Sequence, residues 1–153
     1  MPAATEPFTT AGTTIAIALD TSPATYDEAG FAALTFEEIG EITDAGEYGR
    51  QYALVTHNPI GDRRTVKRKG SYNDGAMTLQ MARVPTDAGQ TDLQSALDSD
   101  LDSSIEVTLQ DGTKQYFEAQ IMSYTTNLGS VDQITGAMVQ IEISNDIIEV
   151  APA

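Results

Sequence analysis

The chain has 153 residues, a length typical of a single domain that can bury its own hydrophobic core. It contains no cysteine, which excludes disulfide bonds, thiolate chemistry and cysteine-based metal sites. The 23 Asp and Glu outnumber the eight Lys and Arg, and the resulting net charge of −15 repels nucleic acid and anionic lipid over most of the surface.

The N-terminal segment has no basic region of the kind that begins a secretory signal peptide. No apolar stretch approaches the ~20 residues that span a bilayer. We therefore expect neither export nor contact with a membrane. We expect residues 1–153 to form one domain, in which 1–12 and 145–153 are flexible ends or assembly arms.

The dominant pattern along the chain is an alternation of apolar residues with polar or small ones. Successive side chains of a β-strand point to opposite faces, so such runs predict strands that bury one face. Five runs predict these buried positions: Ile15, Ile17 and Leu19; Met77, Leu79 and Met81; Ile105, Val107 and Leu109; Phe117, Ala119 and Ile121; and Ala137, Val139, Ile141 and Ile143.

His57 is the only histidine, and it lies at the end of a predicted strand. A general base or a metal ligand is conceivable at this position, but the sequence offers no set of partner residues for either role. A structural or surface role for His57 is therefore favoured.

A short basic segment, GDRRTVKRKG, occupies residues 61–70. Five of the eight Lys and Arg fall within seven consecutive positions: Arg63, Arg64, Lys67, Arg68 and Lys69. Outside them, three basic and 23 acidic residues leave a balance of −20.

Three interpretations of this basic segment are open. It can be a solvated loop, as charge runs usually are. It can bind nucleic acid, although no aromatic residue for base stacking lies between Gly61 and Ser71. It can also contact a second copy of the same acidic chain, and head-to-tail contacts of this kind produce rings or open filaments.

Turn residues separate the predicted strands. Asn58-Pro59-Ile60-Gly61 interrupts the chain before the basic segment, and Asn73-Asp74-Gly75 marks a turn after it. We therefore expect residues 65–71 and 76–84 to be antiparallel neighbours. Asp111-Gly112 predicts a second hairpin with a type I′ turn, because that turn needs positive φ.

One segment, residues 87–98, departs from the alternating pattern. Leu93, Ala96 and Leu97 have helical spacing, and Asp87 with Gln90 three residues later is typical of a capping box. The chain as a whole therefore predicts a mainly β fold: an antiparallel β-sandwich or barrel with one flanking α-helix.

The sequence shows no arrangement of residues that supports catalysis. Asp98, Asp100 and Asp102 resemble the start of a calcium loop, but Ser103 and Leu109 stand where that loop requires Gly and Glu. Neither a phosphate-binding glycine loop nor G-x-S-x-G occurs. We therefore expect no enzymatic activity, no metal and no cofactor.

Several features follow one another in a distinctive order between residues 34 and 144. They are the run FEEIGEI, expected as a strand, the segment YALVTHNPIGDRRTVKRKG with its long loop, the helix GQTDLQSAL, the D-G hairpin followed by an aromatic strand, and the closing strand AMVQIEIS. This order and spacing resemble the major tail tube proteins of long-tailed phages, especially lambda-like siphophages, and of phage-derived particles such as gene transfer agents.

The resemblance implies a β-sandwich flanked by a helix, six subunits in a ring, and rings stacked into a tube around a central channel. It implies that the tube belongs to the virion tail, is assembled in the host cytoplasm, and works with a tape measure protein, a tail terminator and baseplate or distal tail proteins. DNA would pass through an acidic channel without specific binding.

The resemblance also suggests roles for particular residues. The long loop would reach the neighbouring ring, so Arg63, Arg64, Lys67, Arg68 and Lys69 are expected at the contact between rings. Thr78 and Gln80 are candidates for side chains that face the channel.

Two other kinds of protein fit parts of the sequence. One is a related tube protein, either the inner tube of a contractile tail or the tube of a type VI secretion-like system. The other is a carbohydrate-binding β-sandwich, although such modules present aromatic platforms and this chain has no Trp, with six Tyr and four Phe that are scattered.

Overall fold

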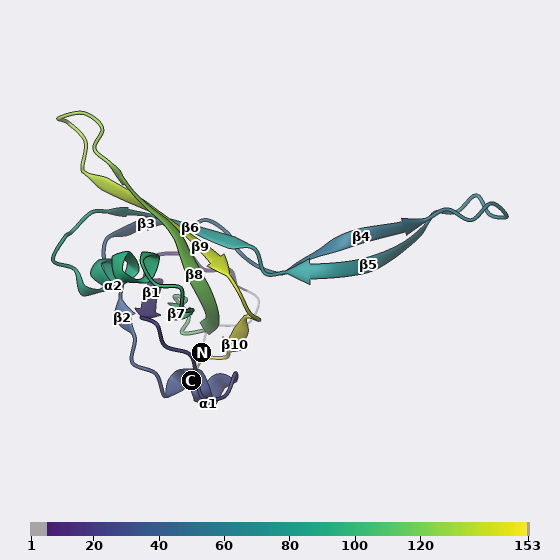
Figure 1. Ribbon diagram of the computed structural model, residues 1–153, viewed down its shortest axis with the longest axis horizontal. Helices are drawn as coiled ribbons and strands as arrows, with labels where there is room; N and C mark the ends of the chain where they lie inside the picture. The colour runs from purple at the N-terminus through teal and green to yellow at the C-terminus, as the bar shows by residue number, and fades with distance from the viewer. Residues whose placement is uncertain (1–5, 153) are drawn as a thin grey trace.

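The five alternating runs form the central strands of one antiparallel sheet in the computed structural model, which describes residues 6–152 (Figure 1). These strands are β1 (Thr14–Ala18), β6 (Ala76–Ala82), β7 (Ser103–Thr108), β8 (Lys114–Asn127) and β9 (Gly136–Ile143). The order across the sheet is β2-β1-β7-β8-β9-β6-β3. The expected mainly β, antiparallel fold class is confirmed.

Short strands complete this sheet, and two further strands leave it. β2 (Glu37–Glu38) and β3 (Ile42–Asp44) form its edges, and β10 (Ile148–Val150) pairs with β8 beyond the end of β9. β4 (Gln51–His57) and β5 (Val66–Asn73) pair only with each other and project from the body (Figure 1).

The connection between β2 and β3 shows that the sheet is curled. These strands lie at opposite ends of the sheet order, yet only residues 39–41 separate them. Four residue steps span at most about 14 Å, so the two edges must approach each other closely. The expectation of a single strand in FEEIGEI is wrong because Glu41, with a φ of 60°, breaks the extended backbone there.

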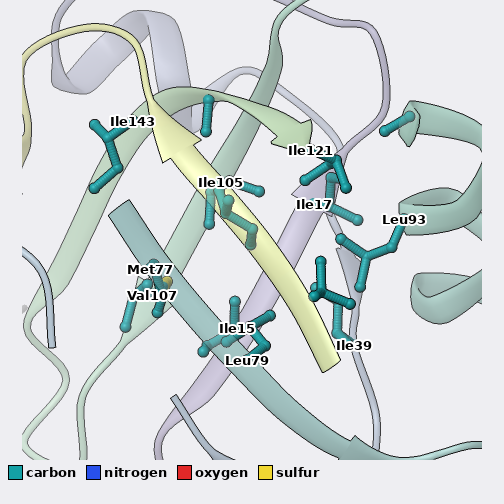
Figure 2. Packing of buried hydrophobic residues seen from close by; sticks show 14 of the residues in the cluster. Ile15, Ile17, Ile39, Met77, Leu79, Leu93, Ile105, Val107, Ile121 and Ile143 are labelled. Atoms are coloured by element: carbon teal, nitrogen blue, oxygen red, sulfur yellow. The ribbon is translucent and has the colours of Figure 1, made fainter. Parts of the chain in front are cut away.

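A continuous hydrophobic core fills the concave side of the curled sheet (Figure 2). The predicted inward positions of all five alternating runs are buried, except that Leu19 and Leu109 are only partly buried at the margin of the core. Burial of such side chains is the main favourable term for folding. The alternation therefore decides which sheet face is enclosed and which stays exposed.

The helix α2 (Ala88–Leu97) covers part of this core through Leu93 and Ala96. Asp87 caps its first turn as expected, since the Asp87 carboxylate accepts a hydrogen bond from the Gln90 N–H at 3.0 Å. Gly89 permits close packing, because a Cβ atom there would lie 2.3 Å from the carbonyl oxygen of Glu38.

Gln90 does not complete a capping box, as the sequence pattern had suggested. Its side chain is buried, and Oε1 accepts a hydrogen bond from the Val84 N–H at 2.9 Å. Its Nε2 donates to the carbonyl oxygens of Gly40 at 3.0 Å and Ala82 at 2.9 Å. Gln90 therefore ties α2 to the β2–β3 connection and to the end of β6.

Replacing Gln90 with Leu is expected to destabilise the fold by about 3 kcal/mol, because three buried backbone groups lose their partner. For a domain of this size that loss lowers Tm by roughly 6–12 °C. Thermal unfolding followed by circular dichroism measures the shift. Gln94→Leu, on the same helix, is the control, and an equal loss in both variants would contradict the role given to Gln90.

A second helix, α1 (Glu28–Ala32), was not expected from the sequence. Its cap is Asp27, whose Oδ1 accepts a hydrogen bond from the Gly30 N–H at 2.8 Å, and this bond lowers the pKa of the Asp27 carboxyl. Phe31 is fully buried and stacks on Tyr116 with ring centroids 5.2 Å apart. Five residues are too few to show helical periodicity in a sequence.

The turn at Asp111-Gly112 joins β7 to β8, so the predicted hairpin is confirmed while its turn type is not. Gly112 has a φ of 95°, but Asp111 is not in the positive-φ region that a type I′ turn requires. The Gly112 N–H donates to Leu109 O at 3.0 Å and the Leu109 N–H donates to Thr113 O at 2.8 Å, which is typical of a type I turn followed by a glycine bulge.

The C-terminal end is held more closely than expected. Within 145–152, β10 pairs with Lys114–Tyr116 of β8, and Asp146 bonds to residues of the body. At the other end, residues 6–12 form no strand, and residues 1–5 lie outside the described part of the chain.

Candidate assembly interface

The β4–β5 hairpin, here called the arm, is the most prominent exposed feature (Figure 1). All seven residues of β4 are exposed, and no strand of the body pairs with either arm strand within residues 6–152. The expected pairing of residues 65–71 with 76–84 is wrong: β5 pairs with β4, and β6 pairs with β3 and β9. The segment 58–65, which was expected to belong to the long loop, connects β4 to β5 and forms the tip of the arm.

The five clustered cations all lie on the arm. Arg63 and Arg64 belong to the tip, and Lys67, Arg68 and Lys69 belong to β5. The side chains of all five are exposed, and none forms an ion pair with a carboxylate within residues 6–152. The positive charge of the arm is therefore available for contact with a second molecule.

Apolar side chains accompany these cations. On one face of the hairpin Leu54 is paired with Lys69, and on the other Val55 is paired with Arg68. Leu54 is 67% exposed and Val55 is 51% exposed, while Ile60 at the tip is fully exposed. An isolated two-stranded hairpin is marginally stable in water. The exposed apolar groups on this one therefore favour a protein partner that covers them.

A polar cluster fixes the base of the arm to the body. The Arg50 guanidinium lies 3.4 Å from Asp74 Oδ1 and 2.8 Å from Asp146 Oδ1, and it stacks 4.2 Å from the centroid of the Tyr72 ring. Asp74 is buried, so Arg50 supplies the charge that this carboxylate needs. The Tyr26 hydroxyl donates to the Asp146 carbonyl, which joins the C-terminal segment to the same cluster.

Replacing Arg50 with Ala is expected to loosen the arm, because Asp74 and Asp146 lose their shared cation and Tyr72 loses its stacking partner. Amide hydrogen exchange should become faster across residues 49–76 than elsewhere. Arg83→Ala is a matched control, since Arg83 also bonds to a side chain and lies over a tyrosine ring but follows the end of β6 that is farther from the arm. Equal exchange of the arm in both variants would contradict this role for Arg50.

The convex face of the sheet carries the side chains that alternate with the core. Thr78 and Gln80 of β6 are exposed there, opposite Gln140 and Met138 of β9. Gln120 and Thr125 of β8 continue the same face. None of these positions is Lys or Arg. Around these positions the face is polar, and its carboxylates are Glu142 of β9 and Asp44 of β3, which is opposite Gln80. Toward β7 the same face also carries Glu106, Lys114 and Glu118.

This convex face has a free edge on each side within the described residues. β7 pairs with β8 only as far as Ala119, so residues 120–127 of β8 have no strand on that side. At the other side β3 is only three residues long and ends the sheet. Unpaired strand edges are templates for another chain.

The remaining candidate features bring no catalytic arrangement together. His57 ends β4 and is exposed beside the arm tip. Asp98 lies at the end of α2, and Asp100 and Asp102 follow in the connection to β7. Within residues 6–152 no three His, Cys, Asp or Glu side chains gather as a metal site, and no helix is long and apolar enough to cross a membrane.

Solved structures resemble this chain, although no family model and no curated protein matches its sequence. A chain in the six-fold symmetrised baseplate of the anti-feeding prophage superimposes with a TM-score of 0.71 at 10% identity, covering 96% of this chain and 97% of that one. The SPP1 tail tube gives a TM-score of 0.65 at 14% identity over 90% of this chain and 75% of that one. The tail of an empty GTA particle, computed with C6 symmetry, gives 0.61 at 13% identity over 79% and 90%.

These matches define the class of fold. The curled antiparallel sheet with few helices is the fold of tail tube structures. The likeness extends over most of the chain and therefore includes the sheet and its flanking helix.

Proposed function

We propose that this protein is a non-enzymatic structural component of a virion tail, which assembles into stacked six-membered rings that form the tail tube. One observation carries the proposal: a single subunit combines a polar convex sheet face, free strand edges on both sides of that face, and a projecting basic arm. The tail structures that share its fold support the same assembly.

Ring formation follows from the two free edges. The edge of β8 at residues 120–127 in one subunit pairs with the β3 side of the next, which extends the sheet from subunit to subunit. Because the two edges differ, this contact is heterologous, and repetition closes into a ring. The six-fold symmetry of the anti-feeding prophage baseplate and of the GTA tail supports six subunits.

In such a ring the convex face lines the channel. Thr78 and Gln80 then point to the lumen together with the amides and hydroxyls of β8 and β9. None of these lumen positions is Lys or Arg, so they offer no cation to phosphate and DNA passes without binding. The tape measure protein occupies the channel before DNA ejection.

The arm makes the contact between rings. Its five cations project beyond the body and meet acidic groups of the next ring, while Leu54, Val55 and Ile60 contribute apolar contact area. Opposite charges mainly fix register and speed the encounter, and the buried apolar groups supply most of the affinity. The ends of the tube bind a tail terminator and baseplate or distal tail proteins. The tube is assembled in the host cytoplasm and carried in the virion of a long-tailed phage or a gene transfer agent.

Negative-stain electron microscopy of the purified protein at high concentration tests this function. Rings or tubes with a central hole are the expected result. A strictly monomeric protein under all conditions, including in the presence of tail initiator components, would overturn the proposal.

A further inference from the structure

The arm and the helix α2 lie at opposite ends of the long axis of the molecule (Figure 1). Head-to-tail stacking along this axis brings the arm of one copy against the α2 end of the next. We therefore expect the surface that receives the arm to be formed by exposed residues near α2.

One surface there, which we call the α2 face, is formed by the outer side of α2 with the neighbouring strand β2. It combines carboxylates with exposed leucines, and its members are Glu37, Asp92, Leu97, Asp98, Asp100 and Leu101. Leu97 is 37% exposed and Leu101 is 62% exposed. No Lys or Arg occurs anywhere in residues 84–113, which include α2 and its connections. The mixture of negative charge and apolar area is the complement of the mixture on the arm.

The carboxylates of the α2 face form no ion pair within residues 6–152. Burial raises the pKa of the Asp92 carboxyl, and the nearby Glu37 carboxylate raises it further. At the other end of the helix, Asp98 and Asp100 follow a last turn that contains no basic residue. The carboxyl end of a helix carries partial negative charge and favours cations. Both ends of the α2 face would therefore gain from an incoming Arg or Lys.

A competing surface occurs at the same end of the molecule. The loop between β8 and β9 exposes Leu128, Val131 and Ile134, and Figure 1 shows it projecting away from the arm. This loop is more apolar than the α2 face, but Asp132 is its single carboxylate between residues 128 and 135. One carboxylate cannot balance five cations, so charge complementarity favours the α2 face as the partner of the arm.

We propose that the α2 face is the docking site for the basic arm of a second copy of this chain in the adjacent ring. This inference rests on the proposed tube assembly and names the surface that receives the arm. The arm cations approach Asp98 and Asp100 at the helix end and the Glu37–Asp92 pair beside it, and the arm aliphatic groups cover Leu97 and Leu101.

A charge exchange between the two surfaces tests the docking site. The arm variant carries Arg63→Glu, Arg64→Glu, Arg68→Glu and Lys69→Glu, and the face variant carries Glu37→Lys, Asp98→Lys and Asp100→Lys. All of these side chains are exposed, so both variants should fold. Each variant alone is expected to reduce tube length by at least about tenfold, because like charges then meet at the contact. The two sets combined in one chain should restore tubes.

The control variant carries Glu6→Lys, Glu47→Lys and Asp132→Lys, which change the net charge as much as the face variant does and include the competing loop. It is expected to form tubes normally. If the wild type forms no tubes, the proposed function itself fails. Three results would show that the arm docks elsewhere and would overturn the assignment of the α2 face. The face variant stacks normally although the arm variant does not, the combined variant forms no tubes, or the control variant blocks stacking as strongly as the face variant does.

Discussion

Reversing Arg63, Arg64, Arg68 and Lys69 to Glu is expected to reduce tube length by at least about tenfold while the subunit stays folded. The four side chains are exposed on the arm and form no ion pair with the body within residues 6–152. Surface substitutions of this kind change stability by about 0.5 kcal/mol or less each. In an assembled tube the same positions would place negative charge against the acidic surface of the next ring.

Sedimentation and electron microscopy measure tube growth, and circular dichroism measures folding. Neutral Gln substitutions at the same four positions are the matched control, and they should weaken stacking less than Glu because they remove attraction without adding repulsion. The effect of Glu should also diminish in high salt, where the Debye length falls from about 8 Å at physiological ionic strength to roughly 3 Å at 1 M. Normal tubes from the Glu variant at all salt concentrations would show that these charges have no part in stacking.

Placing cations on the convex sheet face is expected to stop DNA delivery without stopping assembly. Thr78→Lys and Gln80→Lys change two exposed positions of β6 that contribute no side chain to the core. In the proposed tube each subunit then adds two cations to the channel wall. Every ring would hold DNA phosphates during ejection, and delivery of DNA should fall by at least about tenfold.

The readouts for this second prediction are the titre of particles that carry the variant and the salt-dependent retention of DNA by purified tubes. Thr78→Glu with Gln80→Glu is the control, because it adds the same number of charges with the sign that repels phosphate and should preserve delivery. A Lys variant that delivers DNA at the level of the wild type would mean that Thr78 and Gln80 do not line the channel.

The sheet could be predicted from the sequence because its signal is local. Burial of one face forces apolar residues to alternate, and runs such as Met77-Leu79-Met81 therefore mark both the strand and its buried side. The helix α2 was equally visible, since Asp87 caps it and Leu93 with Ala96 forms its buried stripe. These features depend on residues that are near one another in the chain.

The arm was located correctly as a basic segment, but its pairing was not. Asn73-Asp74-Gly75 has the composition of a hairpin turn, yet it marks the point where the chain leaves the arm and enters the body. Asp74 holds that position through Arg50, and Arg50 also binds Asp146, which lies 96 residues away. Contacts at such sequence separation leave no local pattern.

The division of FEEIGEI into β2 and β3 has a similar cause. A continuous strand was expected, but the curl of the whole sheet requires the chain to cross from one edge to the other between Glu38 and Ile42. Curl depends on how all the strands of one subunit pack together, so it cannot be predicted from the alternation or composition of a single strand. The two free edges and the position of α2 opposite the arm became visible only with the tertiary structure.

Helical reconstruction of the assembled protein by electron cryo-microscopy is the decisive test of the proposed tube. We expect six-membered rings with Thr78 and Gln80 on the wall of a central channel, and the arm of each subunit on the α2 face of a subunit in the adjacent ring. Closed dimers without a channel, or a tube whose lumen is lined by the basic arms, would contradict it.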